Sequence, residues 1–212
     1  MQKLDAIIFD MDGTLFDSSS VVPDAYRACV EPLGRADLDR QDIIDLYHLG
    51  PPPNILRHLL GREGEPHEVD SYHSHLAEQA TDLRPYAGME DLLRTLRDRD
   101  GMRLAVFTGA STHSCGILLE PGSLHEYFDE LIGSDRVDAP KPAPDGLLLT
   151  CERLGVEPGR AAYVGDSILD QLAARAAGMV AVAAGWGHLF DPETDADLVA
   201  MHPGDVLRLV GD

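Results

Sequence analysis

Lysine is nearly absent from this chain of 212 residues, and positive charge as a whole is scarce. Seventeen basic residues, of which only Lys3 and Lys141 are lysines, stand against 37 acidic residues and give a formal net charge of -20 at pH 7. A protein this acidic repels nucleic-acid phosphates and anionic lipid headgroups. We therefore expect no nucleic-acid partner and no membrane partner, and an anionic substrate needs a local cation or a metal ion to receive it.

Cysteine and long apolar runs are also scarce. Cys29, Cys115 and Cys151 lie far apart, without the paired spacing of a zinc site or of a disulfide framework. The first apolar run is interrupted by Asp5 and ends at Asp10, a pattern that fits neither a signal peptide nor a membrane span. We expect three reduced thiols and a cytoplasmic location.

The remaining composition, 44% hydrophobic and 25% charged, is that of an ordinary globular protein. Five short apolar runs have the length of buried strands: residues 4–9, 104–107, 130–132, 161–164 and 180–183. Between the last four runs lie segments with helical spacing: residues 110–119, 147–154 and 168–177. Strands that alternate with helices predict an α/β fold, with a doubly wound parallel sheet as a Rossmann-like core.

The segment between the first two predicted strands is far longer than a single crossover requires. It carries helical patterns at residues 25–33, 40–46, 55–60 and 69–80, and it contains no clear strand pattern. We expect an inserted small helical cap domain over residues 18–83, and a catalytic core over residues 1–17 and 84–212. The run Pro51-Pro52-Pro53 is expected to be a loop, since proline cannot continue a helix interior.

Two aspartates, Asp10 and Asp12, follow the first predicted strand directly and precede a glycine. Ligands bind at the carboxyl ends of strands in an open parallel sheet, and carboxylates there can bind metal, attack a substrate or transfer protons. A calcium-binding EF-hand also starts with this spacing, but its required glycine and glutamate fall on Leu15 and Val21. A turn whose acids cap the next element is the simpler alternative for this motif alone.

Later strand ends carry further polar groups. Thr108 and Gly109 follow the second predicted strand, where a hydroxyl and backbone N–H groups can hold a phosphoryl oxygen, although such a pair is often only a turn. Lys141 lies in a loop stiffened by three prolines, which suits a point charge facing a phosphoryl group better than an exposed surface lysine.

Asp166 and Asp170 follow the fourth predicted strand, four residues apart and on one side of a helix if one begins there. Acidic residues are also common at helix N-termini, which explains one aspartate better than two. Together with Asp10 and Asp12 they would form a cluster of carboxylates that cannot all ionise without a cation. An all-oxygen site with room for phosphate predicts Mg²⁺ as the cofactor.

These motifs, taken in order, resemble those of the haloacid dehalogenase superfamily, in its branch of phosphatases with a helical cap (phosphoglycolate phosphatase-like). The resemblance covers nearly the whole chain. It implies that Asp10 attacks phosphorus and forms an aspartyl-phosphate, and that Asp12 protonates the leaving oxygen and then activates water. It further implies that Thr108 and Lys141 hold the phosphoryl group.

The same resemblance implies that Mg²⁺ is bound by Asp10, by the backbone carbonyl of Asp12, and by Asp166, with Asp170 a ligand directly or through water. One position departs from the family, which often has asparagine where this chain has Gly109. A backbone N–H can serve at that position, so the departure affects one side-chain contact and leaves the reaction intact.

Other reactions on this scaffold are the main alternatives. True dehalogenases lack the aspartate found here at Asp12, and phosphonate-cleaving relatives need a cap lysine, which is absent between Lys3 and Lys141. A hexose-phosphate mutase stays open, although the segment Leu49 to Pro52 is more similar to the phosphatase type. A receiver domain is much shorter and lacks an insertion, and a catalytically silent scaffold is the remaining non-enzyme alternative.

The cap is expected to select the substrate, since the sheet residues contact only the phosphoryl group. His48 and Arg57 flank the proline run and are the candidate substrate-binding residues of the cap. We expect a small phosphorylated metabolite, of the phosphoglycolate or sugar phosphate type, as the partner. The oligomeric state is left open.

Overall fold

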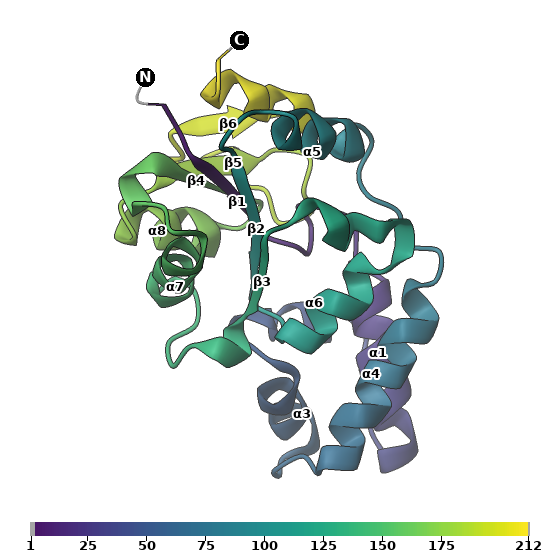
Figure 1. Cartoon of the computed structure of the whole chain (residues 1–212). Helices are drawn as coiled ribbons and strands as arrows, with labels where there is room; N and C mark the ends of the chain where they lie inside the picture. The colour runs from purple at the N-terminus through teal and green to yellow at the C-terminus, as the bar shows by residue number, and fades with distance from the viewer. Residues whose placement is uncertain (1–2, 212) are drawn as a thin grey trace.

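The computed structural model describes residues 3–211, and its centre is a six-stranded parallel sheet in the order β3-β2-β1-β4-β5-β6 (Figure 1). The strands are β1 (Ala6–Phe9), β2 (Arg103–Thr108), β3 (Glu130–Gly133), β4 (Ala161–Gly165), β5 (Val180–Ala184) and β6 (Leu198–Ala200). Each of the five predicted runs forms a strand. The sequence analysis missed β6, because a partly exposed edge strand of three residues carries too short a pattern.

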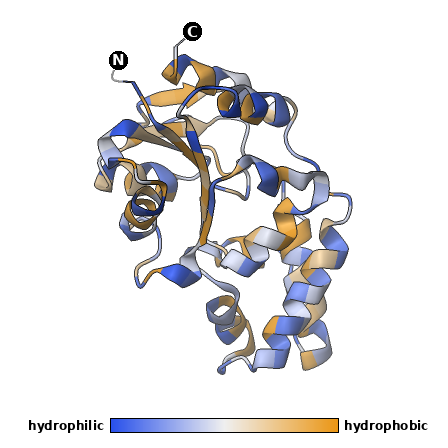
Figure 2. Cartoon of the chain, viewed as in Figure 1, coloured by the Kyte–Doolittle hydropathy of each residue, from blue (hydrophilic) through white to orange (hydrophobic). Residues whose placement is uncertain are grey.

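The strands are apolar along their length because both faces of the sheet are covered. Ile7 and Phe9 of β1 pack into one hydrophobic cluster, while Ala6 and Ile8 pack into a second cluster on the opposite face. This alternation is the two-residue period of a strand. Figure 2 shows the resulting band of hydrophobic residues along the centre of the sheet.

Four helices cover the sheet, which confirms the doubly wound α/β prediction. α5 (Met89–Arg97) and α6 (Thr112–Leu119) pack on one face, and α7 (Asp145–Leu154) and α8 (Ile168–Ala176) pack on the other. Short 3₁₀ segments join them: η3 (Pro121–Tyr127), η4 (Ser134–Arg136), η5 (Pro158–Arg160) and η6 (Pro203–Leu209).

The insertion between β1 and β2 is helical, as the sequence predicts. Its elements are α1 (Val21–Val30), η1 (Glu31–Leu33), α2 (Arg40–Ile44), η2 (Tyr47–Leu49), α3 (Pro52–Leu60) and α4 (Pro66–Ala80). In Figure 1, α1, α3 and α4 lie together to one side of the sheet. α1 and α4 pack on each other, with the rings of Tyr26 and Tyr72 stacked at a centroid distance of 4.0 Å.

The proline run was wrongly predicted to be a loop. Pro51 is the N-cap of α3, and Pro52 and Pro53 are its first two residues. Proline is tolerated in the first helical turn, because the N–H groups there have no partner inside the helix and the fixed φ suits helical backbone. The run therefore starts a helix and leaves the helix interior free of proline.

The two connections between the sheet and the insertion lie side by side. Phe16 forms isolated β-bridges with Asp12 and with Pro85, and the N–H of Tyr86 donates to the carbonyl oxygen of Leu15 at 2.9 Å. The chain leaves and re-enters the sheet region through this pair of adjacent connections. Within residues 3–211, every helix is too short or too polar to cross a lipid bilayer.

Candidate active site

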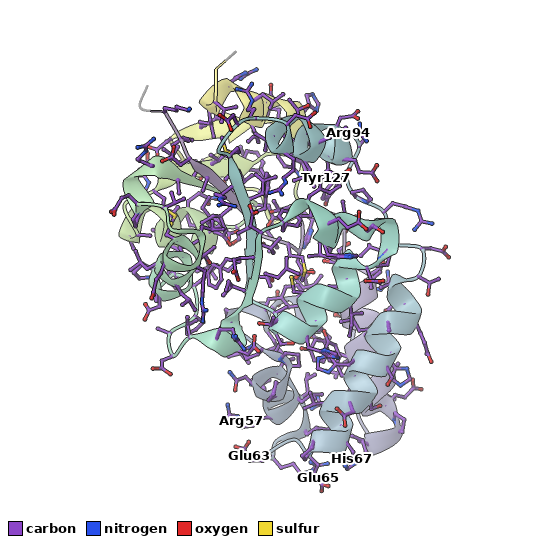
Figure 3. All side chains as sticks on the ribbon, viewed as in Figure 1. Arg57, Glu63, Glu65, His67, Arg94 and Tyr127 are labelled. Carbon is purple, nitrogen blue, oxygen red and sulfur yellow. The ribbon has the colours of Figure 1, made fainter. Side chains whose placement is uncertain are left out.

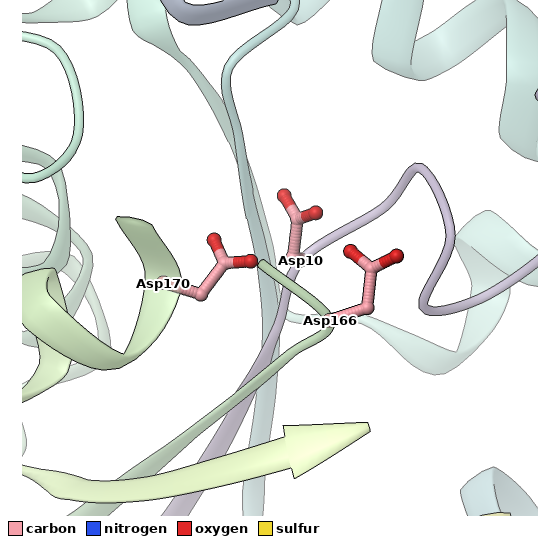
Figure 4. A group of neighbouring side chains, drawn as sticks. All are labelled: Asp10, Asp166 and Asp170. Carbon is pink, nitrogen blue, oxygen red and sulfur yellow. The ribbon is translucent and has the colours of Figure 1, made fainter. Parts of the chain in front are cut away.

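Three buried aspartates from two neighbouring strand ends meet at the carboxyl edge of the sheet (Figure 4). Asp10 follows β1, and its N–H donates to the carbonyl oxygen of Val164 in β4 at 2.8 Å. Asp166 follows β4, and Asp170 lies in the first turn of α8. One carboxylate oxygen of each lies within 4.8 Å of the others. The pairing of β1 with β4 thus brings together residues 156 and more positions apart.

Burial raises the pKa values of the carboxyl groups at this site. Loss of hydration raises the pKa of Asp10 well above its ordinary value, with Lys141 opposing the rise. Burial also raises the pKa of Asp12, against hydrogen bonding from Ser18, and raises the pKa of Asp166 to about 7. Each shift follows from the cost of placing a negative charge in a dry, acidic site.

A divalent cation fits this donor set. Oδ1 of Asp166 is buried and has no hydrogen-bond partner within the described residues, so it leaves a lone pair for a metal ion. Its Oδ2 accepts a hydrogen bond of 2.9 Å from the N–H of Leu189. A Cβ at Gly13, which has a φ of +74°, would lie 2.2 Å from this same oxygen, so only glycine fits beside the carboxylate.

Lys141 is the cation that faces these acids. Its Nζ lies 2.9 Å from Oδ1 of Asp10 and 2.6 Å from Oδ1 of Asp170. Burial alone would lower the pKa of the ammonium group, but the two carboxylates outweigh burial and raise it. The hydroxyl of Tyr163 lies 3.3 Å from Nζ and donates to the carbonyl oxygen of Phe107 at 2.8 Å. Lys141 is therefore held charged at the centre of the site.

Asp170 is more engaged than the sequence analysis anticipated. Its Oδ2 accepts hydrogen bonds from the N–H and from the Oγ of Ser167, at 2.9 and 2.6 Å, and so caps the start of α8. Its Oδ1 is the oxygen bound to Lys141. A carboxylate with both oxygens already bonded acts first by positioning Lys141 and the helix, and has less capacity left for direct metal binding.

Asp12 and Thr108 complete the sheet side of the site. The hydroxyl of Ser18 donates to Oδ1 of Asp12 at 2.5 Å, which holds this carboxylate at the edge of the pocket. The hydroxyl of Thr108 accepts from the N–H of Ala110 at 3.1 Å, so its own proton is free to donate to a ligand. Gly109 lines the same pocket, and an added Cβ there would make only ordinary contacts at 3.9 Å.

A cavity of about 210 Å³ lies between these groups and the inserted helices. Of the two predicted substrate-binding residues of the cap, only one lines this cavity. His48 lines the cavity, and its Nδ1 lies 2.7 Å from the carbonyl oxygen of Asp45. Arg57 does not line it: its guanidinium donates to Asn54 at 2.6 Å and to Glu63 at 3.2 Å. Figure 3 labels Arg57 and Glu63 near each other towards the lower end of the insertion. We therefore leave Arg57 out of the proposed substrate-binding set.

The family model of the haloacid dehalogenase-like hydrolases matches residues 4–178, which span both the sheet residues described above and the helical insertion. The chain belongs to this family. The resemblance inferred from the sequence motifs is thereby confirmed.

Relatives of this hydrolase cover nearly its whole length. A phosphoglycolate phosphatase of Chromobacterium violaceum is 34% identical over 211 residues, covering 93% of this chain and 92% of that protein. Probable phosphatase IndB of Dickeya dadantii is 34% identical over 188 residues, covering 85% and 81%. The structure of CbbY from Rhodobacter sphaeroides in complex with phosphate has a TM-score of 0.81 at 25% identity, covering 96% of each chain. This member of the family is a phosphoric monoester hydrolase.

Several residues of this hydrolase site were missed by sequence reasoning. Residue 18 was predicted only as the first residue of the insertion, although a serine close behind the two aspartates Asp10 and Asp12 is a candidate hydrogen-bond donor. Leu189 and His188 lie in the loop after β5 and contact Asp166. In the same loop, the indole N–H of Trp186 donates to the carbonyl oxygen of Thr14 at 2.9 Å. The two glycines that flank Trp186 were the available signal for a close approach of this loop.

Proposed function

We propose that this hydrolase removes the phosphoryl group from a small phosphorylated metabolite through an aspartyl-phosphate on Asp10. The observation that carries the proposal is the placement of Asp10 at the end of β1, buried and with the Nζ of Lys141 at 2.9 Å. A carboxylate held rigidly at a strand end, next to a fixed positive charge, is suited to attack phosphorus as it is brought within reach.

Asp12 is proposed as the proton carrier. It gives its proton to the leaving oxygen in the first step and takes one from water in the second, so that the aspartyl-phosphate is hydrolysed. Its pKa is raised by burial, which favours the protonated form that the first step needs. The hydrogen bond from Ser18 fixes the direction of the carboxyl group and ties it to the start of the insertion.

Mg²⁺ is the proposed cofactor, with Asp10, the backbone carbonyl of Asp12, and Asp166 as ligands, and Asp170 binding it directly or through water. When bound, the ion neutralises charge on the phosphoryl oxygens and lets the clustered carboxylates stay ionised. The free oxygen of Asp166 and the proximity of the three carboxylates support this assignment.

The phosphoryl group itself is proposed to bind Thr108, Lys141 and the backbone at Gly109. The hydroxyl proton of Thr108 has no acceptor within the described part of the chain, and Lys141 supplies the charge that compensates the transferring group. Because Asp170 holds the other side of Lys141 at 2.6 Å, the ammonium is kept in place without help from substrate. This preorganisation avoids a rearrangement during the reaction.

Residues 18–83 are proposed to act as the cap that closes over the site and excludes water, with 1–17 and 84–212 as the core. The narrow pair of connections at Phe16 and Pro85 supports a hinge there. A cavity of about 210 Å³ admits a small metabolite and excludes a folded protein or a nucleic-acid duplex. His48 faces that metabolite from the cap. The proposed location is the cytoplasm, and the oligomeric state is open.

The test is the variant Asp10→Asn. We expect kcat for inorganic phosphate release to fall by at least about three orders of magnitude, because an amide is not a competent nucleophile here. Asp82→Asn, at an almost fully exposed side chain, is the matched control and should retain the wild-type rate. More than about a tenth of wild-type activity in Asp10→Asn would reject the nucleophile. Isomerised sugar phosphate without phosphate release would instead favour a mutase.

A further inference from the structure

The wall of the cavity opposite the aspartates is apolar and aromatic. It is formed by Val22 and Tyr26 of α1, Ile44 of α2, Ile55 of α3 and Tyr72 of α4. The stacked pair of Tyr26 and Tyr72 gives this wall a rigid surface. Burial of apolar or aromatic atoms of a ligand against such a surface is favourable.

Positive charge is nearly missing from the same cavity. Among the lining residues of the described chain there is no arginine, and Lys141 is the single lysine. Lys141 is already bound to Asp10 and Asp170 and is assigned to the phosphoryl group. Apart from Lys141 and two histidines, the charged residues of the lining are aspartates, and one of them, Asp45, belongs to the insertion. The part of the cavity beyond the phosphoryl site thus offers no cation to a second anionic group.

The two histidines of the lining do not change this balance. Nδ1 of His48 lies 2.7 Å from a carbonyl oxygen, which can only accept, so Nδ1 donates and, in the neutral ring, Nε2 is left as an acceptor. A neutral donor such as a hydroxyl suits that acceptor, and a carboxylate does not. His188 lies on the sheet side, with Nδ1 3.9 Å from Oδ2 of Asp166. The Nδ1 of His188 therefore lies beside the acidic cluster that the proposed metal ion and the phosphoryl group occupy.

Besides Oδ1 of Asp166, one further polar group of the lining residues lacks a hydrogen-bond partner among residues 3–211. The hydroxyl of Tyr47, in η2, is buried and makes no hydrogen bond with any described residue. Burial raises the pKa of this phenol well above its ordinary value, so the group is neutral and able to donate or accept. A buried hydroxyl without a hydrogen-bond partner costs free energy, unless a bound ligand supplies that partner. Tyr47 therefore indicates an uncharged hydrogen-bonding group on the substrate.

We infer that the substrate is a phosphomonoester of an uncharged alcohol, with an apolar or aromatic portion against the tyrosine wall and a neutral polar group at Tyr47. This inference rests on the proposed phosphatase function and names its substrate class. It departs from the expectation of a short acid phosphate such as phosphoglycolate. A carboxylate in this cavity loses its hydration and finds no cation in return.

Three phosphates of primary alcohols test the inference: 2-phosphoglycolate, 2-hydroxyethyl phosphate and benzyl phosphate. The first two have nearly the same size and differ in the charge of the end group, while the third adds an aromatic ring. We expect kcat/KM for 2-hydroxyethyl phosphate to exceed that for 2-phosphoglycolate by at least about tenfold, and benzyl phosphate to exceed both. Equal or faster turnover of 2-phosphoglycolate would overturn the inference.

Two variants test which residues cause the expected preference among the three esters. Tyr47→Phe should raise KM for 2-hydroxyethyl phosphate by about tenfold and leave benzyl phosphate nearly unchanged. Tyr127→Phe is the same change at a tyrosine that does not line the cavity, and it should leave KM unchanged for both esters. Ile44→Arg supplies the missing cation at a half-buried position and should raise the preference for 2-phosphoglycolate over 2-hydroxyethyl phosphate. Retained benzyl phosphate turnover shows that each variant is folded.

Failure of this inference is distinct from failure of the proposed function. If the enzyme with Mg²⁺ releases phosphate from none of the three esters nor from an aryl phosphate, the phosphatase proposal falls and the substrate class with it. If it turns over all three but prefers 2-phosphoglycolate, the phosphatase proposal stands and only the substrate class is wrong. Unchanged ratios of kcat/KM among the three esters in both Tyr47→Phe and Ile44→Arg would likewise overturn the substrate class.

Discussion

At the scale of single residues, the site depends on one ammonium group between two carboxylates. Lys141 lies within 3 Å of both Asp10 and Asp170, and its side chain is only 11% exposed. A point charge with three donors fits this space, whereas a planar guanidinium is larger and spreads its donors in a fork. The identity of the cation therefore matters as well as its charge.

We expect Lys141→Arg to lower kcat/KM for any accepted phosphomonoester by at least about a hundredfold while the fold is retained. Steady-state phosphate release measures the rate, and circular dichroism checks the fold. Lys3→Arg, at the exposed position of the other lysine, is the matched control and should behave as wild type. Near-normal kinetics of Lys141→Arg would make Lys141 an ordinary loop residue.

The residues of the candidate site could be located from the sequence at this scale because each lies near the end of a predicted apolar run or in a proline-rich loop. Asp10, Thr108 and Asp166 follow runs whose apolar pattern is unambiguous. The contributions of Tyr163 and Tyr47 were not predictable. A tyrosine inside an apolar strand or a short loop gives no sign in the sequence that its hydroxyl reaches Lys141 or a cavity.

At the scale of elements, the contact between α4 and α6 joins the insertion to the sheet domain through a pair of histidines. The rings of His73 and His113 meet edge to face at a centroid distance of 4.4 Å. Burial, with a smaller contribution from the neighbouring His113, lowers the pKa of His73 to about 4 from its ordinary value of 6.5. The folded protein therefore binds this proton less readily than the unfolded chain does.

We expect His73 to contribute a fall in melting temperature as the pH is lowered from about 6.5 towards about 4, since the unfolded chain gains a proton in this window. The raised pKa of Asp166 contributes in the opposite direction, so the test compares variants and not the total change. His73→Gln should reduce this fall by a few degrees, as measured by thermal unfolding at about pH 8 and about pH 5. His67→Gln, at an exposed histidine of the same helix, should leave the fall unchanged. Identical pH dependence in all three proteins would remove His73 as the cause.

Elements were predictable where burial is two-sided or a helix is long. The central strands match their apolar runs within about two residues, because both faces are covered and polar residues mark the ends. β6 and the start of α3 were not predicted correctly. An edge strand of three residues is fixed by its pairing with β5, and Pro52 and Pro53 act by their position in the first turn.

At the scale of the whole molecule, chain topology brings four distant segments to one edge of the sheet. β1 pairs with both β2 and β4, so Asp10 lies between Thr108, the last residue of β2, and Asp166, which follows β4. The insertion then supplies the opposite wall of the cavity. With a net charge of -20, the protein as a whole repels a phosphorylated substrate, and Lys141 with the proposed Mg²⁺ supplies the attraction at this edge.

The central claim is that the phosphoryl group passes through Asp10. Rapid acid quenching during turnover of benzyl phosphate, followed by peptide mass spectrometry, measures this directly. With Mg²⁺ present, we predict a phosphoryl group on the peptide that contains Asp10, which is absent after chelation and in Asp10→Asn. A phosphoryl group found on another residue, or sustained turnover without any labelling of Asp10, would contradict the account.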